Sequence, residues 1–218
     1  MENNFYNEYF KRQIPIIGKT NQKILENKKI AIIGAGGLGS FYAYSLSGCG
    51  INEMYIVDFD KVSISNIHRQ IMFEINDIGS FKVSHFKKLE KRSNTKITPK
   101  IMYANNFFNT HDDFDIIIDA TDNIKTKLEI DSISKKLNIP FIFTSVDGFM
   151  ARICLYKNKR LNFTQELKPQ GQIPPMVMLA ASIGSTLAIK YLSDLNVTTD
   201  KIYHIDFLQE LQFFKFNA

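Results

Sequence analysis

The sequence predicts an α/β protein in which a mostly parallel, doubly wound sheet is extended by antiparallel strands near the C-terminus. Apolar runs of strand length alternate with helix-like segments as far as residue 144, a pattern typical of parallel strands joined by right-handed crossovers. A glycine-rich turn directly follows the first apolar run. Beyond residue 148 the pattern changes to a strand, a polar loop, one long helix and a terminal hairpin.

The glycine-rich turn joins the first predicted strand to the first predicted helix. Residues 30–33 are apolar and are followed by Gly34, Ala35, Gly36, Gly37, Leu38 and Gly39. Gly34 lets the chain turn sharply, Gly36 leaves room for backbone to approach a phosphate or ribose, and Gly39 allows the helix to pack closely on the sheet. Because the amides at such a helix start bind anions, the turn predicts a Rossmann-like nucleotide site.

Polar side chains on or after later strand ends extend this prediction. Asp58 ends the second apolar strand, where a carboxylate accepts hydrogen bonds from ribose hydroxyls. The other candidates are Asp60, Asn66, Arg69, Gln70, Lys82, Asp119, Asp122 and Asn123. Arginine and lysine neutralise phosphate oxygens, and a carboxylate holds the Mg²⁺ that bridges them. A hydride-transfer site needs less positive charge, so this set favours ATP over a nicotinamide cofactor.

The remaining elements follow from the hydrophobic period of the chain. Strands are expected at 97–103, 114–119, 139–144 and 149–156, with a terminal hairpin at 202–207 and 211–216. Helices are expected at 80–92, 124–138 and 174–192, and an amphipathic arm at 1–13. Four aromatic residues lie near the C-terminus, namely Phe207, Phe213, Phe214 and Phe216. We expect them to be buried as core residues of the edge strands, and contact with a partner protein is the alternative.

Length and composition fit one domain over residues 1–218, with an arm and helix at 1–28, a nucleotide-binding half at 29–148 and a C-terminal part at 149–218. Lysine and arginine number 27 against 22 acidic residues, a surplus that suits polyphosphate or an acidic partner. The basic run at 87–92 reads as a solvated helix face, so no nucleic-acid partner is expected. Cys49 and Cys154 are expected to be structural thiols in a helix and a strand.

The chain shows no clear signal for export or for membrane insertion. The longest apolar run, 176–189, contains several polar residues and is shorter than the ~20 residues that a membrane span needs. The N-terminal segment lacks the apolar core of a signal peptide. A cytoplasmic location without membrane contact is therefore expected.

At these residues the chain resembles the ThiF/MoeB family, the bacterial relatives of ubiquitin-activating enzymes. The matching segments, in chain order, are YFKRQI (9–14), IIGAGGLGS (32–40), VDFDKVSISNIHRQIMF (57–73), GSFK (79–82) and IIDATDN (117–123), with a weaker match at 174–192. Several separate motifs in family order make the resemblance far more specific than one glycine motif alone.

The resemblance implies an ATP- and Mg²⁺-dependent adenylyltransferase. Family members convert the C-terminal Gly-Gly carboxylate of a ubiquitin-fold sulfur carrier, of the ThiS or MoaD type, into an acyl-adenylate in thiamin or molybdopterin biosynthesis. The family pattern places Asp58 on the ribose and Asp122 on Mg²⁺. It places Asn66, Arg69 and Lys82 on the phosphates, with Gln70 supporting their loop. Arg12 matches an arginine that reaches the neighbouring subunit's phosphates, which implies a homodimer.

The chain also departs from the family pattern. It has no CxxC pair, so no zinc is expected. The segment matching the crossover loop, 161–175, has no cysteine, which favours simple adenylation over a covalent adduct with the carrier. Lys125 and Lys127 stand where relatives commonly have arginine, which keeps the charge but loses bidentate geometry.

Other interpretations stay open at this point. A family relative could adenylate a peptide precursor or a modified tRNA nucleoside, or the chain could be a non-catalytic binding subunit. Taken alone, Asp122 could cap the following helix, Asp119 could be structural, and Arg12 could belong to a frayed basic terminus.

Overall fold

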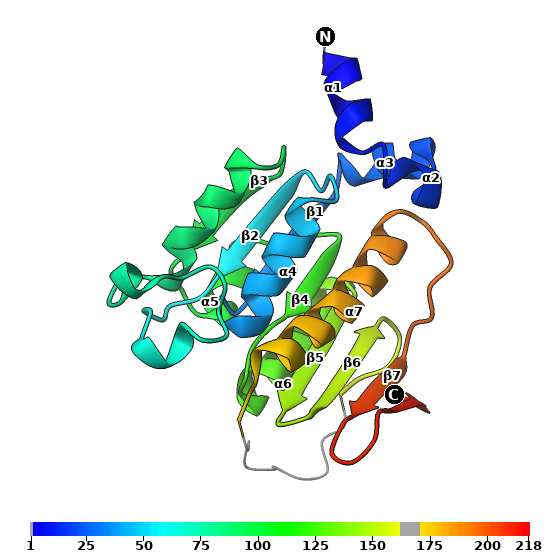
Figure 1. Cartoon of the computed structure of the whole chain (residues 1–218). Helices are drawn as coiled ribbons and strands as arrows, with labels where there is room; N and C mark the ends of the chain where they lie inside the picture. The colour runs from blue at the N-terminus through cyan, green and yellow to red at the C-terminus, as the bar shows by residue number, and fades with distance from the viewer. Residues whose placement is uncertain (1, 162–170) are drawn as a thin grey trace.

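The computed structural model describes residues 2–161 and 171–218, which form an eight-stranded sheet of order β3-β2-β1-β4-β5-β6-β7-β8 (Figure 1). Strands β1 to β5 pair in parallel, and β6, β7 and β8 are antiparallel. This confirms the predicted fold class. The strands are β1 (Lys29–Ile33), β2 (Glu53–Val57), β3 (Lys96–Lys100), β4 (Ile116–Asp119), β5 (Phe141–Asp147), β6 (Met150–Tyr156), β7 (Lys201–Asp206) and β8 (Gln212–Asn217).

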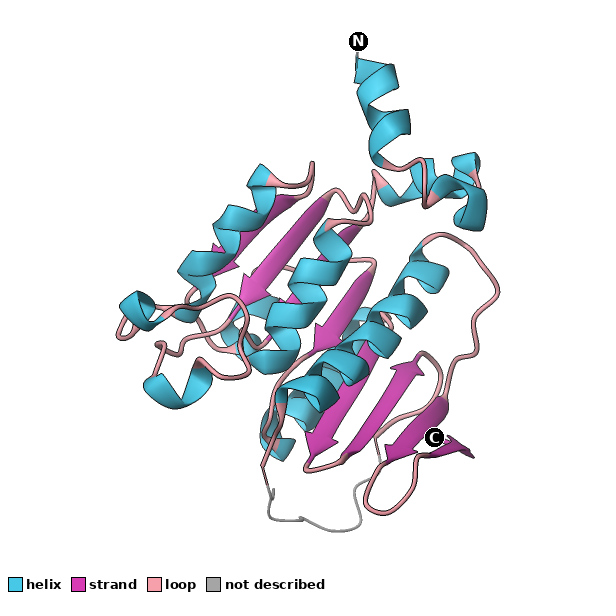
Figure 2. Ribbon diagram, in the orientation of Figure 1, coloured by secondary structure: helices cyan, strands magenta, loops and turns pink. Residues whose placement is uncertain are grey.

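Helices cover both faces of the sheet (Figure 2). Helices α4 and α7 lie side by side on one face, and α5 and α6 lie on the other. Three short helices, α1 to α3, precede the first strand along the chain. They lie near the amino ends of the central strands (Figure 1). The α-helices are α1 (Glu2–Tyr9), α2 (Ile14–Ile17), α3 (Lys19–Leu25), α4 (Gly37–Ser47), α5 (Ala104–Phe108), α6 (Ile124–Leu137) and α7 (Pro174–Leu192).

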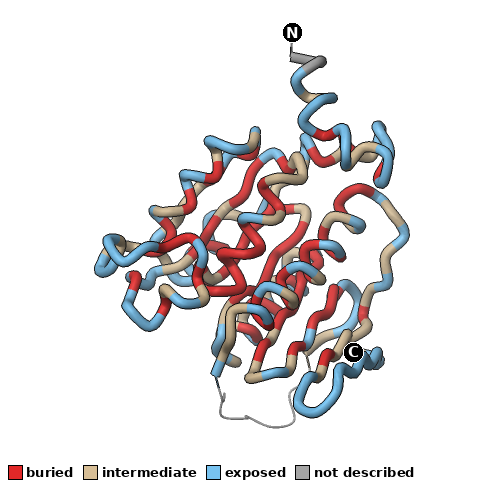
Figure 3. Tube along the Cα trace, in the orientation of Figure 1, coloured by how far each residue is buried: buried red, intermediate tan, exposed pale blue. Residues whose placement is uncertain are grey.

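The sheet separates two apolar cores, and its central strands are buried (Figure 3). Within β1, Ile30 and Ile32 face the core under α4 and α7, and Ala31 and Ile33 face the core under α5 and α6. Alternation of side chains across a strand explains this division. A strand buried on both faces reads as a continuous apolar run, which is how the sequence showed it.

The predicted helix at 80–92 is instead a 3₁₀-helix, η3 (Lys82–Lys91). Its buried apolar residues are Val83, Phe86 and Leu89, a spacing of three that matches three residues per turn. The same spacing also fits one face of an α-helix, so the sequence alone did not distinguish the two. Two shorter 3₁₀-helices, η1 (Ile64–Asn66) and η2 (Ile75–Asp77), lie in the segment between β2 and η3.

The C-terminal hairpin is confirmed as β7 and β8, but the predicted burial of its phenylalanines is wrong. Phe213, Phe214 and Phe216 lie on β8, all six residues of which are exposed, and Phe207 before it is exposed as well. The reason is position: α7 packs over β5 and β6, whereas β8 is the outer strand of the sheet.

Helix α7 is long and apolar enough to cross a membrane by length and composition, the one such helix among the described residues, and half of its most apolar window is buried. A core helix of a globular domain meets the same criterion. Here α7 packs on α4, β5 and β6, which accounts for its apolar composition.

A glycine sets how closely α4 and α7 approach. A Cβ at Gly184 of α7 would lie 1.7 Å from Oη of Tyr42 on α4. Tyr42 is fully buried, and its hydroxyl shares a 2.5 Å hydrogen bond with Oγ1 of Thr144 on β5. The tyrosine therefore cannot move aside without breaking this buried contact.

We expect Gly184→Ala to lower the free energy of unfolding by about 1–3 kcal/mol, because the added methyl overpacks the helix contact. Chemical denaturation of the purified protein measures this. Ser182→Ala is the matched control, because Ser182 is an exposed residue of the same helix. Equal stability of the two variants would show that the approach of the helices does not depend on this glycine.

Candidate functional site

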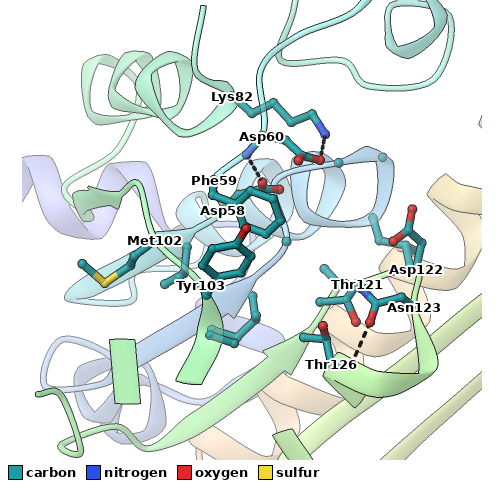
Figure 4. A pocket seen from close by; sticks show the side chains of 18 of the residues that line it. Asp58, Phe59, Asp60, Lys82, Met102, Tyr103, Thr121, Asp122, Asn123 and Thr126 are labelled. Carbon is teal, nitrogen blue, oxygen red and sulfur yellow. Dashed lines mark hydrogen bonds and ion pairs between the residues drawn. The ribbon is translucent and has the colours of Figure 1, made fainter. Parts of the chain in front are cut away.

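A cavity of about 550 Å³ lies at the carboxyl ends of the central strands (Figure 4). In the sheet, β1 lies between β2 and β4, and the strand order changes direction at this point. Doubly wound sheets usually bind their ligands at such a position, and the cavity lies there. Most of the predicted site residues line it, namely Gly34, Gly36, Gly37, Asp58, Asp60, Asn66, Arg69, Gln70, Lys82, Asp122 and Asn123.

The glycine turn has the geometry that the sequence predicted. Gly34 has a φ of +98°, and a Cβ there would lie 2.7 Å from the carbonyl oxygen of Ala120. A Cβ at Gly39 would lie 1.9 Å from the carbonyl oxygen of Gly34, so α4 begins directly against the turn. A Cβ at Gly36 would make ordinary van der Waals contact with Nε2 of Gln70 at 3.5 Å, and Gly36 lines the cavity. The backbone at Gly36 is thus accessible from the cavity.

Asp58 connects this turn to the end of β2. Its carboxylate accepts hydrogen bonds from the backbone N–H of Ala35 at 2.6 Å and of Asp60 at 2.7 Å. Burial raises the pKa of the Asp58 carboxyl, and the two backbone donors oppose that rise. The carboxylate is therefore held in one position beside the cavity.

Cationic and amide side chains form another part of the cavity wall. Nζ of Lys82, whose side chain is 9% exposed, donates to Asp60 at 2.8 Å. Arg69 donates from Nη1 to the carbonyl oxygen of Ser65 at 2.7 Å and from Nε to Gln172 at 3.2 Å. Both side chains line the cavity, Lys82 in an ion pair with Asp60 and Arg69 bound to uncharged acceptors.

Two amide side chains support this wall. Oδ1 of Asn66 accepts a hydrogen bond from the N–H of Ser63 at 2.9 Å, which closes the loop before η1. Gln70 is buried, and its Oε1 has no hydrogen-bond partner among the described residues. A buried acceptor without a partner beside a cavity indicates a place for a donor from a ligand or water.

Asp119, predicted as a possible nucleotide contact, lies beneath the cavity and not among its lining residues. It is fully buried, and one oxygen pairs with Nζ of Lys127 at 3.0 Å. The other oxygen accepts hydrogen bonds from the N–H and hydroxyl of Thr121. Lys127 also donates to the carbonyl oxygen of Thr144 at 2.8 Å. The structural interpretation of Asp119 fits this geometry, and Gly39 likewise lies outside the lining.

Asn123 caps α6, because its Oδ1 accepts from the N–H of Thr126 at 2.8 Å. Asp122 is therefore not the cap that the sequence allowed. Its exposed side chain stands at the rim, where the first cavity adjoins a second one of about 530 Å³. Asp122, Arg69 and Gln172 line both cavities. The second cavity continues over β5 and β6, along Ser145, Asp147, Met150 and Arg152.

Sequence reasoning missed the aromatic end of the first cavity. Phe59 and Tyr103 line it with ring centroids 4.0 Å apart, next to Met102. The sequence placed 101–103 in a strand, but β3 ends at Lys100. Pro99 in that run is compatible with an outer strand, and β3 is the outermost strand on its side.

Arg12 lies between α1 and α2, exposed and outside both cavities. Helix α1 extends away from the sheet at the amino ends of the strands (Figure 1), whereas both cavities are lined by residues at the carboxyl ends. Arg12 therefore does not reach the site of its own chain. The segment that the sequence matched to the crossover loop lies largely outside the described residues.

Neither cysteine has the character of a nucleophile. Burial raises the pKa of the Cys49 thiol to about 11 and that of the Cys154 thiol to about 12. Cys154 lies in β6 as predicted, and Cys49 lies just after α4, not inside it. Residues 2–161 and 171–218 hold no group of three or more His, Cys, Asp or Glu side chains arranged for a metal.

Comparison with known proteins shows the family to which the chain belongs. The model of the ThiF family matches residues 10–218, nearly the whole chain. The chain belongs to the ThiF family. The chain is similar to the adenylyltransferase and sulfurtransferase MOCS3 of Caenorhabditis briggsae, with 30% identity over 153 residues that make up 67% of the chain and 38% of the relative.

Two further relatives are similar over longer segments. A probable molybdopterin-synthase adenylyltransferase of Gracilaria tenuistipitata var. liui is 31% identical over 71% of the chain and 44% of its own length. The sulfur carrier protein adenylyltransferase of Thermus thermophilus is 24% identical over 82% of the chain and 73% of its own length. The chain thus spans about two fifths of the length of the first two curated relatives.

Solved structures share the fold. Escherichia coli MccB, solved with MccA-N7isoASN, superposes with a TM-score of 0.85 at 20% identity over 97% of the chain and 73% of MccB. PaaA superposes with a TM-score of 0.84 at 23% identity over 97% of the chain and 73% of PaaA.

We expect Lys127→Met to lower the free energy of unfolding by about 3–5 kcal/mol, because it leaves Asp119 as an unpaired buried charge. Chemical denaturation measures the change. Lys136→Met on the same helix removes the same charge from an exposed position, and we expect it to change stability by less than about 0.5 kcal/mol. Equal effects of the two substitutions would contradict a stabilising role for the buried pair.

Proposed function

We propose that this ThiF-family protein is an ATP- and Mg²⁺-dependent adenylyltransferase. Its substrate is the C-terminal Gly-Gly carboxylate of a ubiquitin-like sulfur carrier of the ThiS or MoaD type, in thiamin or molybdopterin biosynthesis. The single observation that carries this proposal is the adjoining pair of cavities, which share Arg69, Asp122 and Gln172. The first cavity is suited to a nucleotide and the second to the C-terminal end of the acceptor protein. The two reactants would therefore meet at the residues that line both cavities, of which Arg69 and Asp122 are charged.

The first cavity suits ATP residue by residue. Backbone at Gly36 and the first turn of α4 would face the phosphates. Arg69 and Lys82, which line the same cavity, would neutralise phosphate oxygens. Asp58 stands at the end of β2, where its position suits a ribose hydroxyl. Asn66 holds the start of the loop that carries Arg69 by accepting a hydrogen bond from the N–H of Ser63, and Gln70 lines the cavity beside Gly36.

Asp122 is well placed to be a ligand of Mg²⁺, because its carboxylate is exposed at the rim of the nucleotide cavity. One protein carboxylate together with phosphate oxygens and water is a usual Mg²⁺ arrangement. When bound there, the ion would withdraw charge from the phosphate oxygens. Asp60 is less suitable, since Lys82 already pairs with it at 2.8 Å.

In the proposed reaction, ATP occupies the first cavity and the acceptor occupies the second. The acceptor carboxylate, arriving through the second cavity, attacks the α-phosphorus of ATP while the bond to the pyrophosphate oxygen breaks. Negative charge grows on the phosphate oxygens in the transition state, where Arg69 and Lys82 stabilise it. The protein acts by positioning and electrostatics. The raised thiol pKa values of Cys49 and Cys154 fit a reaction without a covalent enzyme intermediate.

A second copy of the chain would complete the site. Arg12 is exposed at the opposite end of the sheet from the cavities, so in a homodimer it would act on the phosphates bound by the partner. A peptide acceptor is the second candidate, because the similar fold of Escherichia coli MccB was solved with MccA.

ATP–pyrophosphate exchange with Mg²⁺ and a panel of acceptors tests the function. The panel holds a ThiS-like carrier, a MoaD-like carrier, a peptide, bulk tRNA and no acceptor. We expect exchange only with a Gly-Gly-ended carrier, and Asp122→Ala should lower it about a hundredfold or more. Asp112→Ala, which removes an exposed carboxylate outside both cavities, is the control. Exchange with the peptide alone would favour the second candidate, and no exchange with any acceptor would refute adenylation.

Mixing two inactive variants tests the contribution of the second subunit. Arg12→Ala and Asp122→Ala proteins are each expected to be inactive alone. A mixed dimer contains one site with both residues intact, so up to about half of the wild-type exchange rate per mixed dimer should return, in line with the two-fold symmetry of a closed dimer. Mixed dimers that form and stay inactive would rule out action of Arg12 across the dimer.

A further inference from the structure

One arginine stands in the wall of the second cavity, on β6. Ala151 and Ile153 of β6 face the core under α4 and α7, so Arg152 between them points to the opposite face of the sheet. Arg152 is in register with Ser145 of β5, and both residues line the second cavity. The alternation of the strand thus places an exposed guanidinium in this wall.

The charge of Arg152 is not balanced by a carboxylate. Its Nε donates a hydrogen bond to Nδ1 of His204 at 3.3 Å. Among the side chains that the structure describes, no carboxylate oxygen lies within 4.0 Å of its guanidinium. Burial and the charge of Arg152 lower the pKa of His204, against the opposing effect of Asp206. His204 is therefore a neutral acceptor near pH 7 and leaves the charge of Arg152 unpaired.

The other charged side chains of the second cavity have partners or a place in the proposed reaction. Lys127 pairs with the buried Asp119 at 3.0 Å. Asp147, at the end of β5, takes part in an interaction as well. The charged residues that line both cavities would contact phosphate and Mg²⁺. Arg152 remains as the charge that a bound acceptor can neutralise.

The spacing of the strands sets how far Arg152 lies from the boundary between the cavities. Asp122 follows β4, and β6 is two strands away, with β5 between them. Neighbouring strands are about 4.8 Å apart, so this separation is roughly 10 Å. An extended chain advances at most ~3.3–3.6 Å per residue, so about three residues span it. With the terminal carboxylate at the boundary, the residue directly before Gly-Gly would lie beside Arg152.

We propose that Arg152 selects acceptors that carry an acidic side chain directly before the terminal Gly-Gly. This inference rests on the proposed function, which places the acceptor tail in the second cavity. Because Nε already donates to His204, the two Nη atoms are the donors for a bidentate pair with a carboxylate. A basic side chain at the same place would be repelled, so the arginine also rejects acceptors.

ATP–pyrophosphate exchange at increasing acceptor concentration measures this selection. The probes are the ThiS-like and MoaD-like carriers, each prepared with Glu, Ala or Lys directly before Gly-Gly. We expect the lowest KM with the Glu tail and a KM about tenfold higher with the Lys tail, because like charges then meet. The kcat should be the same for all three tails, because Arg152 lies away from the reacting atoms.

Two substitutions separate selection from a structural role. Arg152→Glu should reverse the order, so that the Lys tail gives the lowest KM, and Arg152→Gln should bring the KM values of the Glu and Lys tails within about twofold of each other. Lys215→Glu is the matched control and should keep the original order. Lys215 is an exposed residue of β8 outside both cavities. It is in register with Tyr203, which packs on the core under α4 and α7.

Equal KM values for the three tails in the original protein would overturn the selection and leave the proposed function standing, because exchange itself would occur. An unchanged order in Arg152→Glu would also overturn it. Loss of exchange with every tail in both Arg152 variants would overturn it too, since that outcome indicates a structural role. Exchange with none of the carriers in the original protein would refute the proposed function, and the selection with it.

Discussion

The carboxylate of Asp58 is the contact on which the geometry of this site depends. It accepts hydrogen bonds from Ala35 in the turn after β1 and from Asp60 in the turn after β2. Two loops at neighbouring strand ends are thereby fixed to one another. The positions of the glycine amides, of the Lys82 partner Asp60 and of the Phe59 ring all follow from this single connection. Burial of the charged carboxylate is unfavourable, and for this reason the pKa of the Asp58 carboxyl is raised.

The backbone requirements of the site could be predicted from sequence. Gly34 adopts a positive φ, and α4 packs too closely on the turn for any side chain at Gly39. Because glycine suits both requirements, the residue type itself indicates the backbone geometry. Asp58 was placed correctly because a strand end fixes its position. The succession of strands along the chain and the burial of β1 followed from apolar runs, whereas the order of the strands in the sheet came from the structure.

Contacts between distant segments could not be predicted in the same way. The pairing of Asp119 with Lys127 and the stacking of Phe59 on Tyr103 join residues from different elements, and no local period reveals either. The exposed phenylalanines of β8 were assigned to the core because composition does not tell which strand lies outermost. A helix was predicted at 80–92, but its 3₁₀ type was not, because a spacing of three suits both helix types.

The ion pair between Lys82 and Asp60 changes how the site meets its ligand. Because Asp60 balances the ammonium group of Lys82 at 2.8 Å, the cavity attracts anions less strongly than its number of cationic side chains suggests. An arriving anion must compete with a carboxylate for Lys82, and a small monovalent ion competes poorly. A polyphosphate, which binds at several points at once, can displace that carboxylate. In the proposed function, this pair would favour ligands that carry several negative charges over monovalent anions.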